Sequence, residues 1–148
     1  MISVSMGYPD HQSLVDLLRD RQKVNPLEKA RTIITREDVL ELQKQIQEVY
    51  VSDPVLDYIA SLAEATREHE LITLGLSPRG TLALLRMTKA AAYMAERDYV
   101  IPGDVQKVWA DVAAHRMVLD SRARYQEKSA REILKEILET IPEPKVEG

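Results

Sequence analysis

Three consecutive residues, Ser77-Pro78-Arg79, carry the clearest chemistry in the sequence. Serine is a favoured N-cap residue and proline is favoured at the first helical position, so this pair predicts a helix that begins at Pro78. Arg79 then becomes the second residue of the helix, beside backbone N–H groups that have no hydrogen-bond acceptor within the helix. These groups and the guanidinium together could bind an anion such as phosphate. Arginine is also common at helix starts as a surface residue, and the short motif alone favours that alternative.

The sequence contains no complete catalytic constellation. It has no Gly-x-x-x-x-Gly-Lys-Ser/Thr phosphate loop and no apolar strand that ends in paired acids able to hold Mg²⁺. The histidines, at positions 11, 69 and 115, lie too far apart in the chain to suggest a local metal site. We therefore expect no enzymatic activity from this chain alone.

Composition points to a globular domain built from helices. Of the 148 residues, 45% are hydrophobic and 30% are charged, and the apolar residues are mostly Leu, Ile, Val and Ala. The formal net charge of −4 argues against a dedicated nucleic-acid binder. No cysteine is present, which excludes disulfides and thiolate metal sites. No apolar run is long enough to cross a membrane, so we expect no membrane insertion and a cytoplasmic location.

The spacing of apolar residues predicts an all-α fold, a compact bundle of about six helices. Capping-box patterns mark the N-termini of two predicted helices, with Thr35 and Asp38 at one and Ser129 and Glu132 at the other. One segment differs, because residues 2–6 alternate between apolar and polar side chains and so predict a short strand. A lone strand is unstable in water, and we expect this orphan N-terminal strand to belong to a larger sheet.

The segment Gly75-Leu76-Ser77-Pro78-Arg79-Gly80 resembles the Gly-Ala-Ser-Pro-Arg-Ala sensor-2 motif of MoxR-family AAA+ ATPases. Two residues depart from that motif, since Leu76 and Gly80 each stand where the family has alanine, and this predicts a looser loop and first helical turn. Glu96 stands where the family has glycine. Further segments resemble the family in the same order along the chain: residues 2–10, 51–59, 97–105, 115–116 and 141–144.

The resemblance implies a C-terminal helical lid that closes over a nucleotide held by an α/β core. Residues 1–30 would be the end of the core and the connector, and residues 31–148 the lid. Arg79 would be the catalytic residue that the lid contributes, reaching the γ-phosphate, with Ser77 and Pro78 beside it at the nucleotide. Tyr8 would lie near the adenine, although packing is the commoner role of such a tyrosine. The cofactor would be ATP with Mg²⁺ in the full-length protein, and none is expected on this chain alone.

The same resemblance implies partners for the lid. These are its own α/β ATPase core, neighbouring subunits of a hexameric ring and an unidentified protein client. The family's role would be chaperone-like remodelling, with metal-cofactor insertion or complex maturation as the candidate tasks. No nucleic-acid partner is expected.

Two other functions stay open from the sequence alone. The chain could be a freestanding helical module that binds a partner protein without nucleotide. It could also bind nucleic acid through the basic stretch of residues 115–131, which net acidity makes the weakest option. A phosphate loop encoded upstream of Met1 would distinguish the ATPase lid from the freestanding module.

Overall fold

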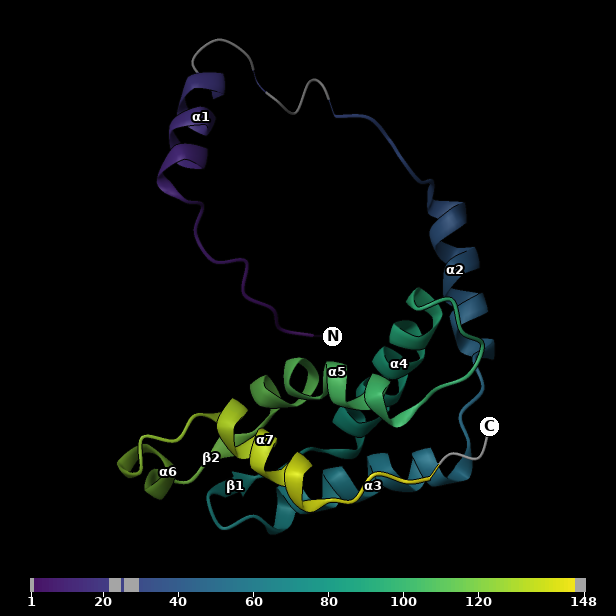
Figure 1. Ribbon diagram of the computed structural model, residues 1–148, viewed down its shortest axis with the longest axis vertical. Helices are drawn as coiled ribbons and strands as arrows, with labels where there is room; N and C mark the ends of the chain where they lie inside the picture. The colour runs from purple at the N-terminus through teal and green to yellow at the C-terminus, as the bar shows by residue number, and fades with distance from the viewer. Residues whose placement is uncertain (1, 22–24, 26–29, 146–148) are drawn as a thin grey trace. The chain divides into compact units, whose positions relative to one another are not determined.

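The computed structural model describes residues 2–21, 25 and 30–145. These residues form two units, one within Val4–Leu42 and the other combining Met1–Ser3 with Gln43–Gly148. Figure 1 shows the elements in chain order. The described residues contain seven α-helices, so the all-α prediction is confirmed: α1 His11–Arg21, α2 Arg36–Glu48, α3 Asp53–Glu68, α4 Pro78–Met94, α5 Pro102–Ala113, α6 Ser121–Tyr125 and α7 Ala130–Thr140.

In the smaller unit, side chains at the helix starts satisfy backbone N–H groups. Asp10 Oδ1 accepts a hydrogen bond from Ser13 N at 2.7 Å, just before α1. The predicted capping box at α2 is confirmed, since Asp38 N donates to Thr35 Oγ1 at 3.1 Å and Thr35 N donates to Asp38 Oδ2 at 2.7 Å. The hydrogen bonds from Thr35 also lower the pKa of the Asp38 carboxyl.

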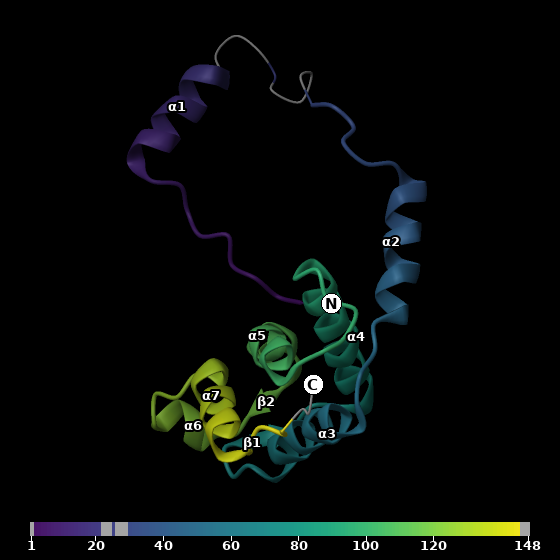
Figure 2. The ribbon, with the colours of Figure 1, turned by 45° about the vertical axis from the view of Figure 1, so that its right-hand side comes forward.

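The larger unit has one core shared by α3, α4, α5 and α7, which lie together in Figures 1 and 2. Trp109 of α5 is buried at its centre and donates its indole N–H to the backbone oxygen of Leu134 in α7 at 3.0 Å. α7 starts at a capping box formed by Ser129 and Glu132, as predicted. Packing of the amphipathic helix faces, more than helix propensity, stabilises such a bundle.

A small antiparallel sheet joins two segments that lie far apart in the sequence. β1 (Ile72–Leu74) pairs with β2 (Val118–Leu119), with Ile72 opposite Leu119 and Leu74 opposite Val118. The sequence of residues 72–76 favours a loop or turn, and residues 115–125 are charged and only weakly periodic, so neither segment predicts a strand. Strands of two or three residues carry too little periodicity to be recognised, and only their pairing makes them strands.

The predicted N-terminal strand is not formed within the described residues. Residues 2–6 form no strand, and Ser3 N donates a hydrogen bond to the backbone oxygen of Asp111 at 2.9 Å. A strand needs a neighbour whose N–H and C=O groups pair with its own. The described residues place no such neighbour beside residues 2–6.

The turn between α4 and α5 is fixed by an ion pair. Arg97 donates to both carboxylate oxygens of Asp104, at 2.8 and 2.5 Å, and Asp104 Oδ2 also accepts from Ile101 N at 3.0 Å. This bidentate contact raises the pKa of Arg97. Asp104 is buried, so the pair is largely shielded from water. It holds the start of α5 against the end of α4.

Two positions after the end of α4, the chain passes through a residue in the left-handed region of backbone space. Glu96 has φ 58°, and Glu96 N and Arg97 N donate to the oxygens of Tyr93 and Ala92 at 2.9 and 3.1 Å. This is the Schellman pattern, in which glycine is the usual residue at the position of Glu96. The left-handed backbone thus explains why the family that this sequence resembles has glycine at this position. In this chain, Glu96 occupies the position with a strained backbone.

We expect Glu96→Gly to stabilise the chain by roughly 0.5–1 kcal/mol, because relief of left-handed strain exceeds the added entropy of the unfolded chain. Urea unfolding followed by circular dichroism measures the change. Glu96→Ala is the control, since it removes the carboxylate but keeps the strain. Equal midpoints for Glu96→Gly and Glu96→Ala would contradict the explanation.

Candidate functional site

The predicted start of the sensor-like helix is confirmed. Ser77 is the N-cap of α4, and its Oγ accepts a hydrogen bond from Gly80 N at 3.2 Å. Pro78 is the first helical residue and Arg79 the second, with an exposed side chain. No acidic residue lies in the first turn, so no carboxylate of this turn competes for the guanidinium or the backbone N–H groups.

The loop before α4 is held directly against the backbone of α3. Leu76 N donates to Thr66 Oγ1 at 2.8 Å, and Arg67 Nε donates to the oxygen of Leu76 at 2.9 Å. Gly75 lies so close to α3 that a Cβ there would be 2.7 Å from backbone atoms of Thr66 and Arg67. These contacts fix the direction in which α4 leaves the loop, and with it the position of Arg79.

The two departures from the family motif compensate for each other. Leu76 is completely buried, and its side chain fills the space beneath Gly80. A Cβ at position 80 would be 2.5 Å from Leu76 Cδ1, too close for an alanine to fit without movement. The larger residue at 76 thus requires the smaller one at 80. The loop and the first turn are therefore closely packed at this pair, in contrast to the expected looseness.

This compensation predicts non-additive stabilities. We expect Leu76→Ala to cost about 2–5 kcal/mol through a cavity, and Gly80→Ala about 1–3 kcal/mol through overpacking. The double variant should cost clearly less than the sum of the two, since each change relieves the defect of the other. Urea unfolding of the wild type, the two single variants and the double variant measures the four free energies of unfolding. Strictly additive losses would refute the compensation between positions 76 and 80.

Arg79 lines a concave pocket of about 510 Å³ together with two further arginines, Arg86 and Arg116. Arg86 lies two turns further along α4, and Arg116 is the last residue of η2 (Ala114–Arg116), the 3₁₀ turn after α5. The remaining lining residues are small, apolar or hydroxyl-bearing: Leu74, Gly75, Ser77, Gly80, Leu82 and Ala83. No acidic side chain lines the pocket, so its chemistry favours an anion.

Arg116 is held in place from its own side of the pocket. Its Nη1 donates to the oxygen of Val112 at 2.7 Å, and a Cβ at Gly80 would lie 3.3 Å from its Cδ. The same Nη1 contacts a ring nitrogen of His115. Desolvation, and then the charge of Arg116, lower the pKa of His115.

The sequence did not indicate that Arg116 joins Arg79. In the sequence, His115, Arg116, Arg122 and Arg124 form a basic cluster that suits a solvated surface better than a contact with a neighbouring subunit. The structure separates these residues, since Arg122 pairs with Asp120 at 3.0 Å while Arg116 lines the pocket. No local signal distinguishes the two cases, because the packing of α5 against α4 brings Arg116 to the pocket.

Tyr8 belongs to the smaller unit, and its side chain is fully exposed. The packing role considered for it is therefore not formed within the described residues. Its expected place near an adenine stays a prediction.

The described residues contain no group of three or more His, Cys, Asp or Glu side chains that could hold a metal ion. In the same residues, no helix is long and apolar enough to cross a membrane. The candidate site is therefore the arginine pocket at the start of α4.

Comparison with known proteins agrees with the geometry. The AAA lid domain family matches residues 64–137, a range that includes Arg79, Arg86 and Arg116. Chaperone MoxR1 of Mycobacterium tuberculosis is 30% identical over 155 residues, covering 99% of this chain. The chain belongs to the MoxR-family AAA+ lid regions.

Other relatives of this MoxR-family lid region agree with the assignment. The uncharacterized protein YeaC of Bacillus subtilis is 35% identical over 144 residues, covering 97% of this chain. A crystal structure of a candidate ATPase from Cytophaga hutchinsonii has a TM-score of 0.86 at 31% identity and covers 98% of the chain. The lid region spans 45% of YeaC, 41% of MoxR1 and 47% of the crystallised chain, so it corresponds to less than half of each relative.

Proposed function

We propose that this chain is the sensor-2 lid of a MoxR-type ATPase and that Arg79 contacts the γ-phosphate of ATP bound by an α/β core. The supporting observation is the pocket at the start of α4, where Arg79 stands with two other arginines and without any carboxylate. An exposed guanidinium in such a pocket is suited to phosphate oxygens, which it can bridge with two N–H groups.

The residues present fit one half of a nucleotide site. Three guanidinium groups line a pocket of about 510 Å³, enough to contact a polyphosphate chain from one side. The described residues include no group of carboxylates for Mg²⁺, which would have to come from the core. We therefore expect this chain alone to bind ATP very weakly. Tight binding measured by calorimetry would contradict the proposal that the chain supplies only half of the nucleotide site.

The residues around Arg79 fix the position of its backbone at the start of α4. Thr66 and Arg67 hold the loop, Ser77 caps α4, and the guanidinium is thereby presented without rearrangement of the backbone. When bound, ATP supplies the phosphoryl group that is transferred to water. Arg79 then stabilises the negative charge that develops on the transferred group.

Arg79 also gives the lid a means to distinguish ATP from ADP. Its contact with the γ-phosphate exists in one nucleotide state and is lost in the other. A contact that differs between two states shifts the equilibrium between lid positions. The lid would carry that change to neighbouring subunits of a ring, which we propose to be hexameric.

The wider assignment belongs to the same proposal. Residues 1–30 would be the end of the core and the connector, of which residues 1, 22–24 and 26–29 lie outside the described residues. Residues 31–148 would be the lid, and Tyr8 would lie near the adenine. The full-length protein would act in the cytoplasm as a chaperone-like remodeller with ATP and Mg²⁺, and its client is a protein.

The coding sequence immediately upstream of Met1 tests this proposal. We expect it to encode, in the same reading frame, a phosphate loop and an apolar strand that ends in acidic residues. An upstream frame without either would contradict the proposal and favour a freestanding interaction module.

A further inference from the structure

The pocket holds more positive charge than one sensor arginine requires. Arg79 and Arg86 are seven residues apart on α4, which places them on one face and about 10 Å apart along the helix axis. Arg116 reaches the pocket from η2, with its side-chain stem against Gly80 in the first turn of α4. The three charges thus come from two elements and extend over two helical turns.

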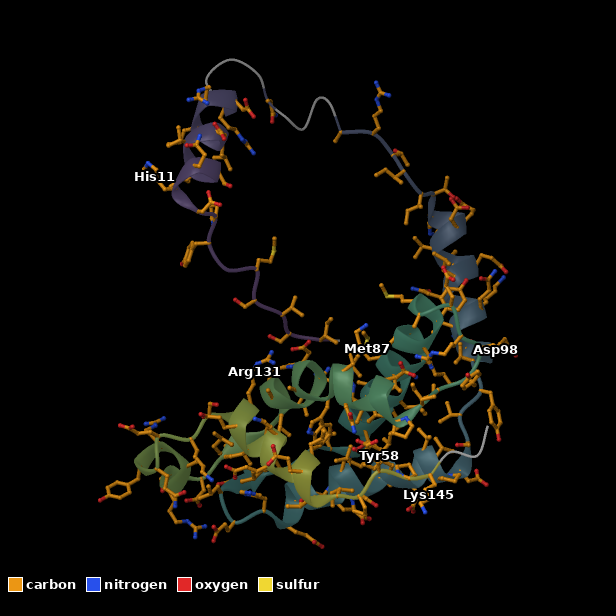
Figure 3. All side chains as sticks on the ribbon, viewed as in Figure 1. His11, Tyr58, Met87, Asp98, Arg131 and Lys145 are labelled. Atoms are coloured by element: carbon orange, nitrogen blue, oxygen red, sulfur yellow. The ribbon has the colours of Figure 1, made fainter. Side chains whose placement is uncertain are left out.

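Ion pairs with aspartate neutralise some of the other arginines of the chain. Four of them pair with an aspartate: Arg19 with Asp16, Arg97 with Asp104, Arg122 with Asp120 and Arg131 with Asp111. Arg131, labelled in Figure 3, lies beside α5 for this reason. Within the part of the chain that the structure describes, Arg79, Arg86 and Arg116 form no ion pair with a carboxylate.

Three like charges around one hollow repel one another, and a bound anion would relieve that repulsion. A single phosphate group is too small to meet charges spread over two turns of a helix. A chain of linked phosphates has the length and the charge for all three. The hydrogen bond from Arg116 Nη1 to Val112 further restricts this guanidinium before a ligand arrives, which lowers the entropy lost on binding.

We propose that Arg86 and Arg116 extend the Arg79 contact into a polyphosphate pocket, so that the lid grips the phosphate chain with three arginines. Identification of the ligand as the triphosphate of ATP rests on the proposed function. The pocket's affinity for polyphosphate is a property of this chain itself and can be measured without the core.

The test uses this chain and sodium tripolyphosphate, titrated at constant ionic strength and followed by the NMR signals of the arginine Nε–H groups. We expect the signals of Arg79, Arg86 and Arg116 to move together, with one dissociation constant in the millimolar range. Arg86→Gln and Arg116→Gln should each weaken binding at least about threefold, as expected for loss of a solvent-screened charge contact. Arg124→Gln, which removes an exposed arginine of α6 outside the pocket, should leave the constant within about twofold.

Folding is monitored by thermal melting, because the Arg116 side chain also donates a hydrogen bond to Val112 of α5. Arg116→Lys keeps the stem and the charge, and we expect it to recover part of the affinity lost in Arg116→Gln. Wild-type affinity in Arg86→Gln or Arg116→Gln, with loss in Arg79→Gln, would overturn this inference and leave the sensor role of Arg79 intact. An equally strong response to acetate at the same ionic strength would also overturn it, since the pocket would then accept any carboxylate.

Discussion

Arg79→Ala is expected to slow ATP hydrolysis by the full-length protein at least about tenfold, since it removes a charged contact to the transferred phosphoryl group. The effect should appear mainly in kcat, because the contact strengthens as charge develops in the transition state. Steady-state turnover with saturating ATP and Mg²⁺ measures it. A tenfold loss corresponds to about 1.4 kcal/mol of transition-state stabilisation.

Two variants make this result specific to the guanidinium. Arg79→Lys keeps the charge but presents one ammonium in place of a planar fork, and we expect an intermediate rate. Arg124→Ala removes an exposed arginine of α6 and should leave turnover unchanged. A wild-type turnover number in Arg79→Ala would rule out a catalytic role for this arginine.

Gly75→Ala is expected to destabilise the chain by about 2–4 kcal/mol, through overpacking and the loss of buried hydrogen bonds. The new Cβ would meet backbone atoms of Thr66 and Arg67 at 2.7 Å, and a helix backbone cannot move aside as a side chain can. The loop would have to leave α3 and break the hydrogen bonds of Leu76 to Thr66 and Arg67. Urea unfolding followed by circular dichroism measures the loss.

Gly103→Ala is the matched control for this substitution. Gly103 is exposed in the first turn of α5, and a Cβ there would meet only Ile101 Cδ1, at 3.9 Å. We expect this change to be neutral or stabilising by up to about 1 kcal/mol, since alanine has the higher helix propensity. Similar unfolding midpoints for the two glycine variants would show that the contact of Gly75 with α3 has no special role.

Features set by neighbouring residues could be predicted from the sequence. The start of α4 depends on a cap whose two partners, Ser77 and Gly80, are three residues apart, and the capping boxes that begin at Thr35 and Ser129 have the same spacing. Helix faces follow from the spacing of apolar residues along one segment. The all-α fold and the position of Arg79 in its helix were therefore accessible without coordinates.

Features that depend on distant segments could not be predicted in this way. The β1–β2 pair exists because the packing of the helices brings Ile72 opposite Leu119. Arg116 reaches the pocket for a similar reason, and no periodicity in its own segment marks it. The fit of Leu76 beneath Gly80 needed interatomic distances, because the two departures from the family motif look independent in the sequence.

The sensor role of Arg79 is tested most directly by comparing affinities for two nucleotides. Dissociation constants are measured for ADP and for a slowly hydrolysed ATP analogue, with the full-length wild type and with Arg79→Ala. Since only the ATP analogue carries a γ-phosphate, we expect Arg79→Ala to weaken its binding at least about threefold more than that of ADP. Equal changes for the two nucleotides, or no change for either, would contradict the account.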